Sequence, residues 1–174
     1  MDTVAGMLIC NDRRWPEAFR VLGLQGAEIV TLGFNTPTEN LHYTEPPALR
    51  VHHHLIMAQS MAFQNAIWLV ETAKCGFEDG FRMFGHSVIV APTGEIVAKS
   101  VSEDDEVIVV NADLSLGDNL RKTMFNLAAL IDDGIVPGKS AEDAARYLYE
   151  SLRSGNEDVL KQLSDNPRMF KENT

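Results

Sequence analysis

The feature that most constrains the fold is a strand that runs through a sharp polar turn into a helix. The apolar run Val4 to Ile9 predicts a buried strand, and this strand ends at Cys10. Four polar residues follow, and a helix then begins with Pro16 in its first turn, where the missing N–H costs nothing. A β-branched strand, Glu28 to Leu32, comes next. Strand, helix and strand within about thirty residues is typical of a layered α/β fold.

The rest of the chain continues this pattern, and its periodicity predicts further helices and strands. The helices are expected at Glu17 to Leu24, Ala48 to Asn65 and Leu114 to about Asp132, the last of them capped by Asp113. The strands are expected at Ile67 to Thr72, Ser87 to Ala91, Glu95 to Lys99 and Glu106 to Ala112, with a glycine loop at Cys75 to Phe84. The residues expected to face the core are Phe19, Val21, Leu22, Val51, Leu55, Ala58 and Ala62, with Trp15 and Trp68 as packing residues.

The last part of the chain differs in character from the rest. Pro137-Gly138 breaks the chain, and Ser140 with Asp143 resembles a capping box ahead of an apolar helical stripe. We therefore expect an α/β domain over residues 1–132 and a helical C-terminal extension over residues 133–174.

Composition excludes several classes of partner. The net charge is −10 and no basic run is present, which argues against nucleic acid and against anionic membranes. Two cysteines do not make a disulfide framework, and neither a signal peptide nor a long apolar span is visible. These observations favour a cytoplasmic location.

The thiol of Cys10 has a placement that suits a nucleophile. A bend between a strand and a helix exposes the sulfur, directs backbone N–H groups at it and sets it near a positive helix end. The alternative is that Cys10 is a small buried hydrophobic residue. Adjacent arginines, Arg13 and Arg14, favour the first interpretation, because charges near a core are costly unless they hold an anion or a carboxylate.

The run His52-His53-His54 resembles a metal cluster but does not predict one. Consecutive side chains on a helix point about 100° apart, so three neighbours share one ion poorly. We expect no metal site here. One of these histidines is instead expected to face the loop Asn35 to Pro47.

Three stretches of the sequence carry a resemblance to a known family. They are ICNDRRWPE (Ile9 to Glu17), GAEIVTLGFNTPT (Gly26 to Thr38) and GHSVIVAPTGEIVA (Gly85 to Ala98). The chain resembles the carbon–nitrogen hydrolase (nitrilase) superfamily, and most closely the N-carbamoyl-D-amino acid amidohydrolases, over about Met7 to Asn126. The resemblance implies the C-terminal half of a four-layer αββα sandwich, an α/β fold, with an additional helical tail.

The resemblance also implies a reaction and a set of site residues. The family uses a Cys nucleophile, a Glu base and a Lys to convert an N-carbamoyl-D-amino acid into the D-amino acid, carbon dioxide and ammonia, with no metal or cofactor. The matching positions are Cys10 as nucleophile, the backbone N–H of Asn11 as oxyanion donor, Arg13 and Arg14 for the substrate carboxylate, and Asn35 and Thr36 as further substrate contacts.

The chain departs from the family in the remaining catalytic groups. The family's Glu and Lys precede the nucleophile, whereas nine residues precede Cys10 here. Glu17 is expected to be a helix-start carboxylate and not the base. Since each such group commonly contributes about 10²-fold or more, we expect the chain alone to be nearly inactive. It would then act in a homo-oligomer or with a second polypeptide that supplies the missing half.

Two alternatives stay open at this point. One is a catalytically silent fragment that acts as an oligomerisation or interaction module. The other keeps the enzyme but changes the substrate to another amide, a β-ureido acid or a nitrile.

Overall fold

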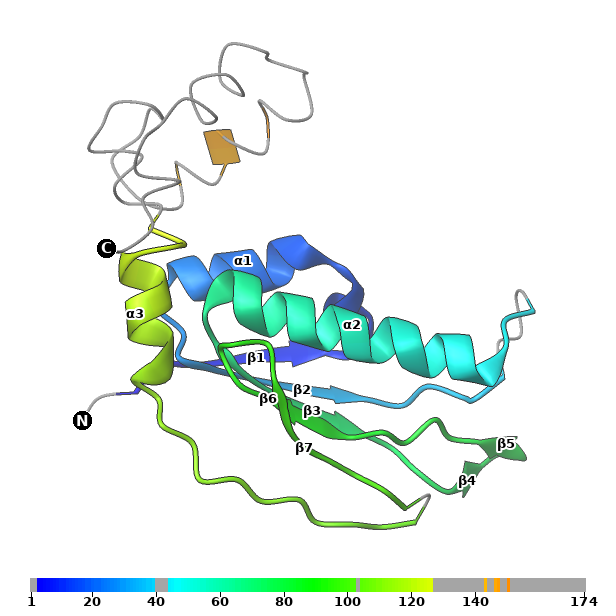
Figure 1. Ribbon diagram of the computed structural model, residues 1–174. Helices are drawn as coiled ribbons and strands as arrows, with labels where there is room; N and C mark the ends of the chain where they lie inside the picture. Colours follow the sequence, from blue (N-terminus) through cyan, green and yellow to red (C-terminus); the bar gives the residue numbers. More distant parts are fainter. Residues whose placement is uncertain are drawn as a thin grey trace. The chain divides into compact units, whose positions relative to one another are not determined.

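The computed structural model describes residues 3–39, 44–102 and 104–126, together with residues 143, 146, 147 and 150 (Figure 1). The chain divides into two compact units, Met1–Asn119 and Leu120–Thr174. The predicted boundary at residue 132 and most of the predicted helical extension lie outside the described residues. A short helix, α3 (Leu116–Lys122), follows the first unit's sheet in the chain.

A five-stranded mixed sheet forms the first unit. Its strands, in spatial order, are β1 (Ala5–Ile9), β2 (Ile29–Phe34), β3 (Trp68–Ala73), β6 (Val88–Val90) and β7 (Ile96–Lys99). The pairs β1–β2 and β2–β3 are parallel, and β6 and β7 form an antiparallel hairpin beside β3. Because parallel strands end at the same edge, the residues that follow β1, β2 and β3 gather there.

Two helices, α1 (Pro16–Leu24) and α2 (Pro47–Asn65), cover one face of this sheet (Figure 1). Pro16 occupies the first turn of α1, as predicted, and α2 begins one residue before its predicted start. The core between helices and sheet is apolar, and its members include Phe19, Val30, Leu32, Ala58, Ala62, Leu69, Val88 and Val90. This packing positions the carboxyl ends of the strands relative to α2.

The opposite face is covered only in part. Trp68 and Ile89 lie on it, and alternate residues of the extended segment 107–114 pack over them. The predicted strand Glu106 to Ala112 is wrong, because this segment has an extended shape but pairs with no strand among the described residues. Alternation of apolar residues selects an extended backbone, whereas a strand also needs a neighbouring backbone.

The prediction that Val4 to Ile9 is buried is also wrong. β1 is the edge strand of the sheet, and on the face away from the helices Met7 is 80% exposed and Ile9 is 70% exposed. Val21 and Trp15, expected inside, are exposed as well; Trp15 instead precedes α1 as its cap residue.

The loop predicted at Cys75 to Phe84 contains a small hairpin. Its strands are β4 (Phe77–Glu78) and β5 (Phe81–Arg82), joined by Asp79 and Gly80, which both have positive φ. Within the described residues, no helix is long and apolar enough to cross a lipid bilayer.

Candidate active site

Cys10 lies where β1 turns into a short 3-10 helix, η1 (Cys10–Arg14), ahead of α1. Its φ is 48°, in the left-handed region that is costly for a residue with a side chain. The carboxylate of Asp12 accepts a hydrogen bond from the N–H of Ile9 at 3.0 Å and so spans the turn. A half-buried thiol is therefore held on a sharp turn at the carboxyl edge of the sheet.

Asn11 follows the thiol in the first turn of η1. Backbone N–H groups in a first turn have no acceptor within the helix, so they are available to an oxygen brought near the sulfur. Donors at such a position stabilise the negative charge that develops on a carbonyl oxygen under attack. The Asn11 side chain is exposed.

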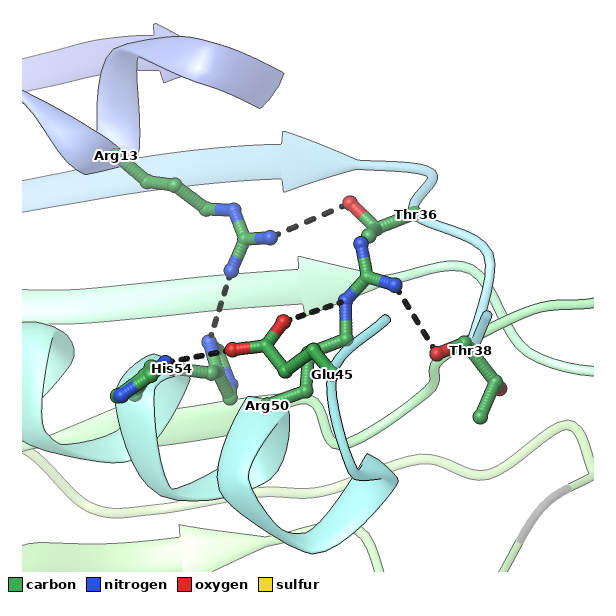
Figure 2. A network of polar contacts seen from close by, with 7 residues as sticks. Arg13, Thr36, Thr38, Glu45, Arg50 and His54 are labelled. Atoms are coloured by element: carbon green, nitrogen blue, oxygen red, sulfur yellow. Dashed lines mark hydrogen bonds and ion pairs between the residues drawn. The ribbon is translucent and has the colours of Figure 1, made fainter. Parts of the chain in front are cut away.

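Arg13 points away from solvent into the protein, and only 6% of it is exposed (Figure 2). Its Nη2 donates to the hydroxyl of Thr36 at 3.3 Å, and its Nη1 lies 3.2 Å from Nδ1 of His54. The guanidinium carbon stands 4.1 Å from the centre of the Phe34 ring. One side chain thus connects η1 to the end of β2 and to α2.

His54 stands between Arg13 and a buried carboxylate. Its Nε2 donates to the carbonyl oxygen of His86 at 2.9 Å, and its Nδ1 lies 3.2 Å from Oε2 of Glu71. His54 and Glu71 are each 2% exposed. With Nε2 protonated, Nδ1 accepts from Arg13 in the neutral ring or donates to Glu71 in the charged ring.

The two largest influences on the pKa of Arg13 oppose each other. Burial lowers the pKa of Arg13, and the negative charge of Glu71 acts in the opposite direction and raises it. An arginine remains protonated at neutral pH even after such a shift. A positive and a negative charge are therefore both buried beneath the Cys10 turn.

The other predicted site residues lie in different surroundings. Arg14 is exposed and forms no ion pair within the part of the chain that the structure describes. Asn35 is exposed, and its side chain contributes a hydrogen bond that helps to lower the pKa of Glu78, after the larger influence of Lys74. Thr36 is buried against Arg13.

A second polar group ties the loop after β2 to α2 (Figure 2). Arg50 donates to the carbonyl oxygen of Thr38 at 3.0 Å, and Glu45 pairs with Arg50 and, at 2.8 Å, with His53. His53 is thus the histidine that faces the loop Asn35 to Pro47. The run of histidines diverges, and among the described residues no three potential metal ligands converge.

Sequence reasoning missed His54 and Glu71 as members of the site. A signal for each was present. Glu71 is the one charged residue in the strand WLVETA, and it lies on the same side of the strand as the core residue Leu69. His54 falls within the apolar stripe of α2. An ionisable residue at a core position indicates a buried partner.

Within the described residues, no carboxylate or lysine hydrogen-bonds to the thiol of Cys10. Glu17, in the first turn of α1, is exposed. The described site therefore has a thiol, amide donors and positive charge, but no base in contact with the sulfur.

Comparison with known proteins places this turn in a family. The family model for carbon–nitrogen hydrolases matches residues 2–122. The chain belongs to the carbon–nitrogen hydrolase family. It is 30% identical over 120 residues to a probable nitrilase of Schizosaccharomyces pombe. This match covers 69% of this chain and 40% of that protein. It is 32% identical over 117 residues to an N-carbamoylputrescine amidase of Solanum tuberosum, covering 63% and 38% respectively.

Solved structures agree with this assignment. A carbon–nitrogen hydrolase from Helicobacter pylori superimposes with a TM-score of 0.60 at 26% identity, over 68% of this chain and 43% of that one. The sheet with α1 and α2 is accordingly part of a nitrilase fold. The chain spans less than half the length of each of these three relatives.

Proposed function

We propose that this chain provides the nucleophile of an enzyme that hydrolyses the carbamoyl C–N bond of N-carbamoyl-D-amino acids. The observation that carries the proposal is the placement of Cys10 at a positive φ on the turn that ends β1, followed by first-turn amides and two arginines. Strained turns of this kind present a nucleophile clear of its own backbone.

The proposed reaction begins when the Cys10 thiolate attacks the carbamoyl carbon. The N–H of Asn11 donates to the oxygen that becomes negative, and ammonia leaves with a proton from a general acid. Water then attacks the carbon of the resulting S-linked thiocarbamate, the C–S bond breaks to return the Cys10 thiol, and the released carbamate breaks down to carbon dioxide and the D-amino acid. Positive charge from Arg13 and Arg14 favours a substrate with a carboxylate, and Asn35 and Thr36 are proposed as further substrate contacts.

The general base and the lysine of this reaction are proposed to come from polypeptide outside residues 1–174. The partly uncovered sheet face, with exposed Met7 and Ile9, supports a second polypeptide or a second copy packing there. The location proposed for the assembly is the cytoplasm. Sedimentation of the purified chain tests association: a monomer at all concentrations contradicts it.

The experiment that tests the function measures ammonia release by the assembled enzyme. Cys10→Ala removes the sulfur and is expected to abolish turnover, whereas Cys75→Ser, which alters a thiol in another loop, is the matched control and is expected to retain it. Turnover that survives in Cys10→Ala overturns the proposal.

A different substrate within the same family is the second candidate. It is favoured by the relatives, which include an amidase for N-carbamoylputrescine and a probable nitrilase. Rates on matched carbamoyl, amide and nitrile compounds, each with and without a carboxylate, separate the candidates. Preference for N-carbamoyl-D-amino acids supports the proposal, and preference for an uncharged amide or nitrile replaces it with the second candidate.

A further inference from the structure

The two adjacent arginines of η1 have opposite environments. Arg13 is 6% exposed, and its donors are engaged by Thr36 and His54. Arg14 is exposed and, within the described residues, has no ion-pair partner. Arginines that appear equivalent in sequence therefore differ in how much charge each offers to a ligand.

Glu71 is buried on β3, and within the described residues its Oε2 has one close polar neighbour, Nδ1 of His54 at 3.2 Å, which donates to it only when the ring is protonated. A buried carboxylate with an unused oxygen is costly unless a nearby positive charge compensates it. Arg13 carries positive charge into this region: burial lowers its pKa, and the negative charge of Glu71 opposes that lowering.

His54 is the physical link between the two charges. Its Nδ1 is 3.2 Å from Nη1 of Arg13 and also 3.2 Å from Oε2 of Glu71. Because Nε2 is held by the carbonyl of His86, the ring cannot turn Nδ1 away from Arg13 and Glu71 without losing that bond. The imidazole therefore keeps guanidinium and carboxylate in a fixed relation.

We propose that Glu71, acting through His54, compensates the charge of Arg13, so that Arg13 positions the Cys10 turn and Arg14 is the residue that meets the substrate carboxylate. This rests on the proposed function in one respect, that the substrate is an anion. Glu71 then sets how strongly the turn attracts anions, since its loss would release the charge of Arg13.

The test compares two alkylating reagents of similar size at Cys10, in a Cys75→Ser background that leaves one thiol. Iodoacetate carries a carboxylate and iodoacetamide is neutral; in both, the thiolate sulfur displaces iodide from carbon. The ratio of their rate constants reports local charge, because changes in thiol exposure or nucleophilicity affect both reagents. No catalytic base is needed, so the result stands even if turnover is absent.

Arg14→Gln is expected to lower the iodoacetate-to-iodoacetamide ratio by about threefold. Glu71→Gln, which removes the charge and keeps the shape, is expected to raise the ratio by about threefold. Glu95→Gln is the matched control, because it removes the same charge far from Cys10. Glu95 lies in the turn between β6 and β7, next to Val90, and Val90 pairs with Leu69 near the amino end of β3.

The double variant Arg13→Met/Glu71→Met decides the question even if Glu71→Gln does not fold, since it leaves no buried charge unpaired. The proposal expects it to keep the ratio within about twofold of the parent. A fall as large as that of Arg14→Gln would show that Arg13 offers its charge to the ligand, and would overturn the proposal. A Glu71→Gln ratio no higher than that of Glu95→Gln would overturn it as well.

Discussion

The carboxylate of Asp12 accepts the backbone N–H of Ile9 at 3.0 Å, and the two residues enclose Cys10 between them. This bond closes the turn across Cys10, whose φ of 48° is unfavourable. A local side-chain bond of this type offsets part of the cost of a strained backbone, as in other turns stabilised by aspartate. The geometry of the thiol therefore depends on a side chain that is not itself reactive.

Replacing Asp12 by Ala should destabilise the chain by about 1 kcal/mol, because the Ile9 N–H loses its acceptor. Urea denaturation followed by circular dichroism measures the change. Asp12→Asn, which retains an acceptor oxygen, is the control and should lose less. Equal stability of Asp12→Ala and the parent would show that the bond does not hold the turn.

Local signals predicted the elements that surround the site. Pro16 begins α1 and the apolar stripe beginning at Val51 marks α2, because helix starts and helical periodicity are encoded within a few residues. The hairpin of β6 and β7 was found for the same reason, since its turn contains Gly94.

Relations between distant residues were not predictable from the sequence. Glu71 meets His54 across 17 positions of the chain, and Arg13 meets His54 across 41. The exposure of β1 and the unpaired segment 107–114 depend on which backbone lies alongside them, and no local pattern encodes that. The Cys10 turn was visible in the sequence, whereas the buried Arg13, His54 and Glu71 contacts were not.

Cys75 should be a poor nucleophile compared with an ordinary thiol. Its partial burial raises the pKa of the Cys75 thiol, and the carboxylate of Asp105, which accepts its S–H bond at 3.5 Å, raises it further. Less thiolate is then present at neutral pH. Asp105→Asn should therefore speed alkylation of Cys75 by iodoacetamide, measured by peptide mass mapping.

The neighbouring acid provides a matched control for this prediction. Asp104 influences Cys75 only through its charge and is the weakest of the groups that raise the pKa of this thiol. Asp104→Asn should speed alkylation less than Asp105→Asn does. The opposite order would show that the S–H bond to Asp105 does not form in solution.

His86 should make stability depend on pH in the weakly acidic range. Burial lowers the pKa of His86, and the charges of His54 and Lys99 lower it further. The unfolded chain then takes up the proton at a higher pH than the folded chain does. Stability contributed by His86 is present above the unfolded pKa of about 6.5 and is lost as pH falls from there toward the folded pKa.

Urea midpoints at about pH 7.5 and about pH 5.5, on either side of the ordinary histidine pKa, measure this effect. His86→Asn is a suitable variant because φ at this position is 61° and asparagine tolerates that region. The variant should lose less stability on acidification than the parent. An identical loss in both proteins would assign the pH dependence to other groups.

Single and double replacement of Arg13 and Glu71 should differ sharply in stability. Glu71→Met leaves a buried guanidinium without its counter-charge and should cost about 3–5 kcal/mol, as for other buried pairs broken on one side. Arg13→Met/Glu71→Met removes both charges together, and the surrounding Phe34 and Leu69 are apolar, so it should lie close to the parent. Equilibrium unfolding of the parent, both single variants and the double variant gives the coupling free energy. Additive losses would mean that Arg13 and Glu71 do not compensate each other, and the structure beneath Cys10 would then have to be held by hydrogen bonds to Thr36 and His54 alone.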